Sequence, residues 1–261
     1  MRDSNGVAFG GGAVIGTLGG LIGLGGAEFR LPLLIGIFRF TALEAVILNK
    51  AMSLMVIATA LPFRAGSVPL GEVVAQWPII INLLAGSLLG AWFGAGWATR
   101  LKSETLYRVI AALLVAIAIV LVTGHDSNSS GGPLFDGWAL LVAGVVAGFG
   151  IGIVASLLGV AGGELLIPTL VLLFGADIKL AGSLSLAVSL PTMIVGFARY
   201  SRDQSFSVLN RNRTFVLVMA IGSIVGTFIG GRLLGLIPSG PLIPALAVIL
   251  LLSAAKVWQH R

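Results

Sequence analysis

Two short strings, far apart along the chain, resemble each other. The first is GLGGAEFRLP at 23–32, and the second is GVAGGELLIP at 159–168. The identical positions are Gly23 and Gly159, Gly26 and Gly162, Glu28 and Glu164, and Pro32 and Pro168. The same offset of 136 positions, without gaps, relates Ser53 to Ser189 and Gly86 to Gly222. The chain therefore contains an internal duplication, and the two strings occupy equivalent places in its halves.

The composition surrounding both strings is that of a membrane protein. Of the 261 residues, 57% are hydrophobic and only 10% are charged, and the mean hydropathy is +1.06. Soluble domains carry about 25% charged residues. The sequence predicts an all-α polytopic membrane protein. It has no cysteine, which excludes disulfides, thiolate metal sites and cysteine nucleophiles.

A polar stretch at 124–136 separates two groups of apolar runs. We predict a first transmembrane repeat at 1–123, an extracytoplasmic linker at 124–136 and a second transmembrane repeat at 137–261. Most runs approach the length of about 20 residues that a spanning helix needs, but those at 29–38 and 165–175 are too short. Each short run is expected either to cross as part of a broken helix or to return within a re-entrant hairpin.

Loop charges indicate how the two halves are oriented. The loop near 64–75 holds one arginine, whereas its equivalent at 199–213 holds four, and the bias reverses at the next pair of loops. Because positive residues favour the cytoplasm, equivalent loops are predicted on opposite sides, which makes an inverted repeat. Both termini are then cytoplasmic. The net charge of +6 comes from basic residues placed singly in short loops, so orientation explains it without a nucleic-acid partner.

The glycine-rich strings are predicted to be the tips of broken elements that form one binding site. Inverted repeats with broken helices are a transporter design, and helix N-termini bind anions without a charged side chain. The alternative is that the glycines only permit tight turns and close packing. The predicted tip residues are Gly25, Gly26 and Ala27 in the first half, and Ala161, Gly162 and Gly163 in the second.

Glu28 and Glu164 are the only acidic residues that the duplication repeats. Ionisable side chains at membrane depth are expensive and commonly functional. We predict a proton-coupling or gating role for the pair, with capping of the helix start as the alternative.

Other polar residues lie inside apolar runs. We expect a substrate-binding role for Asn49, Lys50, Ser53, Ser185 and Ser189, and Ser183 lies on the same polar ladder. Lys50 has no basic counterpart, because Leu186 occupies the equivalent position, and it is expected to face a cavity or an ion-pair partner. Serines in membrane helices also bond to their own backbone. Arg64 and Arg199 either attract an anion or anchor the interface, and Arg30 and Arg39 are interpreted as markers of topology.

At these two strings the chain resembles the TauE/SafE family of membrane permeases. That family carries a G-x-G-G-G-x-x-x-x-P-like motif in each half, followed by a Ser-containing helix and a Gly-rich helix, and the resemblance covers essentially the whole chain. Ala27 and Ala161 replace glycines of that motif, so the two tips are expected to differ in shape. The resemblance implies export of sulfite, sulfoacetate or related organosulfur anions.

The sequence by itself predicts a multi-pass secondary transporter for a small anion. The resemblance implies that it exports a small sulfur-containing oxyanion across the bacterial inner membrane. An importer or channel for another anion is the alternative. An enzyme is disfavoured, because His125 and His260 lie outside the apolar runs and neither an H-E-x-x-H motif nor a serine elbow is present. No cofactor or metal is expected. The expected partners are lipid and the anion, and Gly86, Gly90 and Gly94 serve either a homodimer or internal packing.

Overall fold

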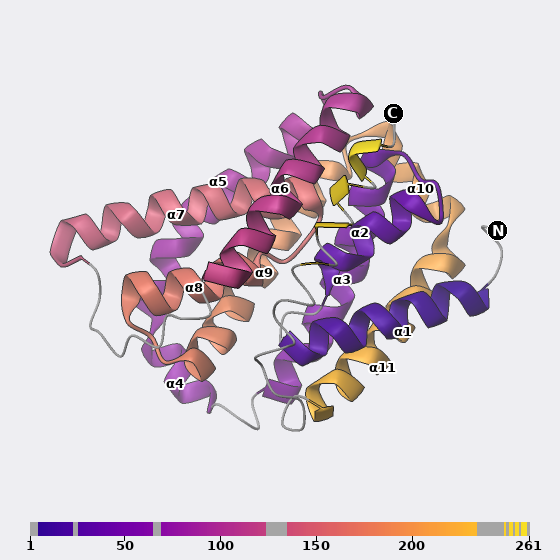
Figure 1. Ribbon diagram of the computed structural model, residues 1–261. Coiled ribbons are helices and arrows are strands. Elements are labelled where there is room, and N and C mark those ends of the chain that lie inside the picture. Colours follow the sequence, from indigo (N-terminus) through magenta and orange to yellow (C-terminus); the bar gives the residue numbers. More distant parts are fainter. Residues whose placement is uncertain are drawn as a thin grey trace.

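The computed structural model describes residues 5–22, 26–64, 69–123 and 135–233, together with a few positions between 248 and 259. These residues form helices, and no strand occurs among them. Figure 1 shows their arrangement. The helices are α1 (Asn5–Ile22), α2 (Ala27–Gly36), α3 (Ala42–Arg64), α4 (Leu70–Ala75), α5 (Trp77–Ala98), α6 (Ser103–Thr123), α7 (Gly137–Leu158), α8 (Gly163–Phe174), α9 (Ile178–Tyr200), the 3₁₀ turn η2 (Gln204–Phe206), α10 (Ser207–Arg211) and α11 (Arg213–Leu233).

Five helices in this part of the chain are long and apolar enough to cross a membrane. The spanning segments are Ala42–Thr59, Trp77–Ala98, Gly137–Leu158, Leu180–Tyr200 and Arg213–Gly230. This confirms the prediction of an all-α membrane protein. By contrast α2 and α8 have 10 and 12 residues. At about 1.5 Å per residue, neither alone crosses a hydrocarbon core of about 30 Å.

Large apolar side chains along α5 are exposed, as expected of a helix that contacts lipid. Trp77, Leu89, Phe93 and Trp97 are between 51% and 62% exposed. Trp77 and Trp97 lie near opposite ends of the helix, and the helix rises about 30 Å from one to the other. Tryptophans are enriched at both membrane–water interfaces. The length of α5 and its two end tryptophans therefore fit a helix that crosses a bilayer with one tryptophan close to each interface.

Two long helix pairs flank the molecule. In Figure 1, α5 runs beside α7 and α1 runs beside α11. Glycines in both pairs face carbonyls of the neighbouring helix: a Cβ on Gly86 or Gly90 would come within 2.1 Å of Val145 O or Phe149 O. The positions equivalent to these two contacts are Gly222 on Phe9 and Gly226 on Ala13. Gly94 likewise lies against Ile153, so the glycine-rich face of α5 serves internal packing.

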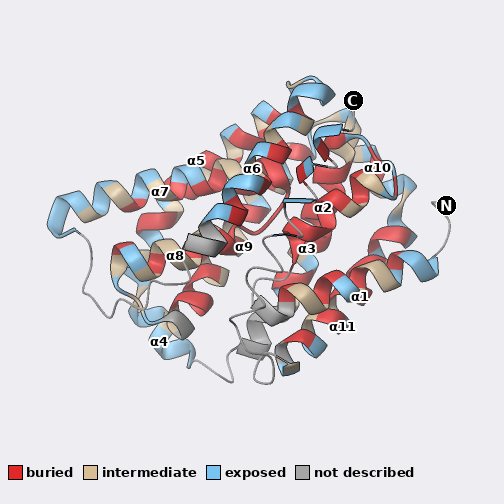
Figure 2. Ribbon diagram, viewed as in Figure 1, coloured by how far each residue is buried: buried red, intermediate tan, exposed pale blue. Residues whose placement is uncertain are grey.

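The centre of the molecule is formed by α3 and α9, against which α2 and α8 pack. Figure 2 shows buried residues along α2 and α3, whereas α4 and the outer end of α7 are exposed. Ile57 of α3 and the equivalent Met193 of α9 form one small apolar cluster with Ala161. The core of the molecule therefore joins the central helices of both halves and reaches the second glycine-rich string.

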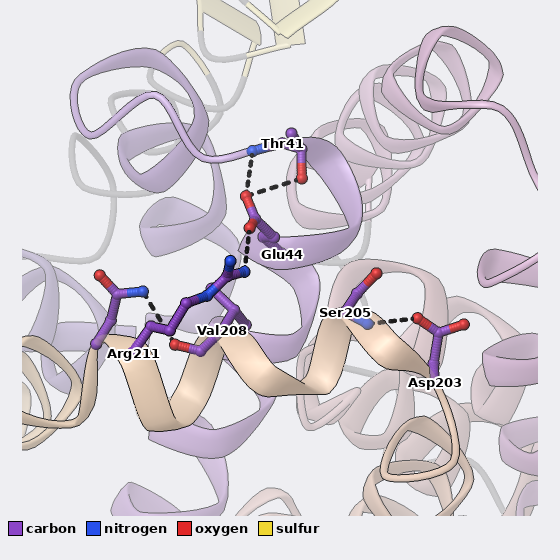
Figure 3. A network of polar contacts seen from close by, with 7 residues as sticks. Thr41, Glu44, Asp203, Ser205, Val208 and Arg211 are labelled. Carbon is purple, nitrogen blue, oxygen red and sulfur yellow. Dashed lines mark hydrogen bonds and ion pairs between the residues drawn. The ribbon is translucent and has the colours of Figure 1, made fainter.

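The loop between α9 and α11 is tied to the start of α3 (Figure 3). The carboxylate of Glu44 accepts from the backbone N–H and the hydroxyl of Thr41, at 3.2 and 3.0 Å. This is the reciprocal side of a capping box, which satisfies N–H groups at a helix start. Arg211 pairs with the other Glu44 oxygen at 3.2 Å, and Asp203 accepts from the Ser205 N–H at 2.8 Å. The pair Arg211–Glu44 links the two halves of the chain.

Candidate functional site

Both short helices begin at a glycine in the left-handed conformation. Gly26 precedes α2 with φ 69°, and Gly162 precedes α8 with φ 81°. Side chains disfavour this region, so glycine fits both positions. At Gly26 a Cβ would also lie 2.5 Å from Ile15 O. No side chain caps either helix start.

The left-handed residue therefore falls at equivalent positions of the two strings. The two alanines that replace motif glycines, Ala27 and Ala161, do not move this left-handed position. Ala27 is the first helical residue of α2, and Ala161 precedes the glycine cap of α8. Gly163 is the first residue of α8. Gly25 lies outside the described residues.

The carboxyl groups of Glu28 and Glu164 are buried and lie next to each other. Glu28 is 0% exposed and Glu164 is 3% exposed. They interact directly across the two helix starts, and each approaches its own backbone N–H. None of their four oxygens has a hydrogen-bond donor in good geometry among the described residues. Two ionised carboxylates this close repel each other, whereas one shared proton gives the pair a donor and an acceptor.

Arg30 is also completely buried, with 0% exposure. Its Nη1 donates to Asn49 Oδ1 at 3.3 Å and to Ser53 Oγ at 3.2 Å. Its Nε and Nη2 have no partner in the described part of the chain. The interpretation of Arg30 as a marker of topology is therefore wrong, since a residue that reports topology lies at the membrane surface. The missed signal was its place inside the repeated string, where the second half has Leu166.

Asn49 connects the first tip with the end of α7, next to the second glycine-rich string. Its Nδ2 donates to Ala27 O at 2.9 Å and to Leu158 O at 3.1 Å, so one side chain on α3 holds both the start of α2 and the end of α7. Both Asn49 and Ser53 lie near the middle of the span Ala42–Thr59. The structure thus brings Arg30, Asn49 and Ser53 together at membrane depth.

Lys50 lies in different surroundings. It is 0% exposed, and its Nζ is 3.4 Å from both Ala155 O and Ser156 Oγ. Gly196 leaves room for it, because a Cβ there would lie 2.7 Å from Lys50 Cε. Among the described side chains no carboxylate pairs with Lys50.

Ser53 of α3 accepts a hydrogen bond from Arg30, but among the described residues no arginine donates to the serines of α9. Ser185 Oγ donates to Gly182 O of its own helix at 2.9 Å, which is the backbone bonding common for serine in membrane helices. The hydroxyls of Ser183 and Ser189 are buried without a partner among described atoms.

Arg199 contacts an aromatic ring. Its guanidinium lies 5.6 Å from the Trp92 ring centroid, and that of Arg202 lies 4.9 Å from the same centroid. These cation–π contacts favour the anchoring alternative for Arg199. The side chain of Arg64 lies outside the described residues, and Arg39 is exposed.

In the described part of the chain, neither a metal cluster nor the apolar groove between α7 and α8 coincides with this site. Within the described ranges, no three His, Cys, Asp or Glu side chains are grouped so as to hold a metal ion. A groove of about 440 Å³ between α7 and α8 is lined mainly by apolar side chains, among them Ile151, Leu165 and Leu172. It contains none of the buried polar residues described above.

The chain was compared with known families, curated proteins and solved structures. No curated protein and no solved structure gives a match. The family model described as Sulfite exporter TauE/SafE matches residues 7–257, which is nearly the whole chain and includes both glycine-rich strings. The protein therefore belongs to the TauE/SafE sulfite exporter family.

Proposed function

We propose that this protein is a secondary transporter that exports a small sulfur-containing oxyanion, such as sulfite, sulfoacetate or a related sulfonate, across the bacterial inner membrane. The observation that carries the proposal is the pair Glu28–Glu164, which joins two glycine-capped helix starts inside the protein. Ionisable groups at membrane depth mark transport pathways and proton relays. Family membership supports the substrate class.

The proposed architecture is an inverted repeat whose tips are re-entrant or broken helices. Equivalent glycines contact equivalent neighbours in the α1–α11 and α5–α7 pairs, as expected of two halves related by a pseudo-twofold axis. In Figure 1, α1 begins at the right of the view and α7, its equivalent, begins at the left. Opposed halves bring their tips together near the midplane, where transporters of this design bind substrate.

The substrate is proposed to lie at these tips, within reach of the starts of α2 and α8. The partial positive charge of a helix N-terminus attracts an anion, and the glycines Gly26 and Gly162 let the backbone come close. The proposed surrounding residues are Gly25, Ala27, Asn49, Lys50, Ser53, Ala161, Gly163, Ser185 and Ser189.

Glu28 and Glu164 are proposed to link the anion to a proton. When both are ionised, the pair carries two negative charges and repels an anion; one bound proton reduces this repulsion. Proton binding and anion binding then favour each other, and the linkage is reciprocal. The membrane potential assists export when the anion leaves without the proton: at −100 mV a monovalent anion alone then gains about 2.3 kcal/mol.

The test is transport in proteoliposomes loaded in turn with sulfite, sulfoacetate, taurine and sulfate, with and without an imposed pH gradient. We expect saturable flux of a sulfur oxyanion that is faster when the loading side is more acidic. Glu28→Gln should remove the response to the gradient, and Glu72→Gln, on the exposed helix α4, should retain it. Flux indifferent to the gradient and to Glu28→Gln would make the protein a uniporter or channel. No flux of any of these anions would refute the proposed substrate class.

A further inference from the structure

Arg30 has a binding capacity that its protein contacts do not use. A guanidinium has five N–H donors in a fixed planar fork. In Arg30 only Nη1 is bonded, to Asn49 and Ser53, and the adjacent Nε and Nη2 atoms are buried without partners among the described residues. Unsatisfied buried donors are costly and rare, and each one calls for an explanation.

The unused atoms lie on one edge of the group. Nε–H and the neighbouring N–H of Nη2 are parallel, which is the geometry that holds two oxygens of one carboxylate, phosphate or similar group. Nη1, on the other side, is fixed by two side chains of α3. The guanidinium is therefore held in place from one side while its bidentate edge stays open.

The acidic groups nearby do not occupy this edge. Glu28 acts on Arg30 electrostatically, but the ion pairs within the described residues do not include it, and its carboxyl group lies against Glu164. The other buried cation, Lys50, contacts Ala155 O and Ser156 Oγ. Among the described residues, the charge of Arg30 is thus without a direct counter-ion.

The second half provides no equivalent group. Leu166 occupies the place of Arg30 and packs with Leu170, Leu184 and Val188 in an apolar cluster. The duplicated tips therefore contain one fixed guanidinium instead of two. One guanidinium, on one side of the Glu28–Glu164 pair, is consistent with one bound anion per chain.

We infer that the Nε–Nη2 edge of Arg30 binds the substrate anion through two of its oxygens, with Asn49 and Ser53 as the residues that position the guanidinium. This inference rests on the proposed function and narrows it. The ligand class is an anion with two oxygens on one atom, such as sulfite, a sulfonate or a carboxylate. A monatomic anion presents a single acceptor, which cannot form two straight hydrogen bonds with these parallel N–H groups.

The experiment measures binding to the purified full-length protein in lipid nanodiscs by isothermal titration calorimetry, with sulfite, methanesulfonate, formate and chloride as probes at constant ionic strength. We expect one site for the oxyanions and no competition from chloride. Arg30→Lys, which keeps the charge but loses the fork, should weaken oxyanion binding at least tenfold. Arg30→Leu, which copies the second half, should abolish it.

Arg202→Lys is the matched control, because Arg202 is exposed and lies over Trp92; it should bind as the wild type does. Size-exclusion chromatography shows whether each variant is folded, and Arg30→Lys keeps the test decisive if Arg30→Leu does not fold. Unchanged sulfite affinity in folded Arg30→Lys, or chloride competing as well as sulfite, overturns the inference even if transport is intact. Arg30-dependent binding without any flux overturns the proposed transport function and leaves the binding site. A wild-type protein that binds none of the oxyanions overturns both.

Discussion

The two halves share a tip and differ in what the tip contacts. In both, a left-handed glycine starts a short helix whose second residue is a buried glutamate. Two positions further on, the first half has Arg30, bonded to Asn49 and Ser53, and the second half has Leu166 in an apolar cluster. In both halves the shared residues turn the chain and present a buried carboxyl group. In our proposal the differing residues hold the anion from the first half.

Leu166→Arg is expected to have the largest effect, because it places the charge of the first half in the apolar surroundings of the second. Leu166 is 1% exposed, and a buried charge without a partner costs several kcal/mol. We expect the variant to lose most of its folded protein in detergent, measured by fluorescence-detected size exclusion. Leu166→Met keeps volume and polarity and serves as the control. A stable Leu166→Arg protein would show that the second tip can also accommodate a guanidinium, which contradicts the asymmetry.

Asn49→Ala should be more damaging than Ser185→Ala at the equivalent position. Loss of Asn49 leaves Ala27 O and Leu158 O without this donor and removes one acceptor of Arg30, at a cost of about 3 kcal/mol. Ser185 donates only to its own helix, and its loss should cost under about 1 kcal/mol. Thermal unfolding in detergent measures both. Equal decreases of the unfolding temperature in the two variants would mean that Asn49 does not hold the start of α2 to the end of α7.

For the glycine contacts between helices, in contrast, we expect similar losses of stability in the two halves. A Cβ on Gly86 would lie 1.9 Å from Val145 O, and one on the equivalent Gly222 would lie 2.3 Å from Phe9 O. Alanine at either position must push two helices apart, at about 1–3 kcal/mol. Gly150→Ala, where nothing lies within 4 Å, should be neutral or slightly stabilising in the same thermal unfolding assay. A large effect in only one half would refute equivalent packing of the two pairs.

The smallest effect is expected at the contact between the halves on the surface. The Arg211–Glu44 pair spans 3.2 Å, and the Arg211 side chain is 63% exposed. Exposed pairs contribute about 0–1 kcal/mol. Arg211→Gln should therefore change the unfolding temperature little, whereas Thr41→Ala removes a capping hydroxyl and should cost about 1 kcal/mol. An Arg211 effect larger than that of Thr41 would show that the bridge between halves contributes more to stability than the helix cap.

Several features of the site could be predicted from the repeated strings. The turn at Gly26 and Gly162 follows from glycine being paired in both halves, and the structure places both at positive φ. The prediction of a role for Glu28 and Glu164 came from their repetition, but the sequence did not show that the two side chains meet. Arg30 was missed because an arginine beside a short apolar run has the same pattern whether it faces water or the protein interior. Its partners lie 19 and 23 positions away on another helix.

The sequence by itself determined the class of protein, the duplication and the residues on which the tips depend, because these follow from local composition and from matching positions. The tertiary structure alone decided which groups meet. It paired α1 with α11 and α5 with α7, placed Asn49 between the start of α2 and the end of α7, and left one edge of a buried guanidinium unbonded. The physical reason is that a hydrogen bond, a helix contact and a shared proton each depend on two groups, and here the second group usually comes from a distant part of the chain.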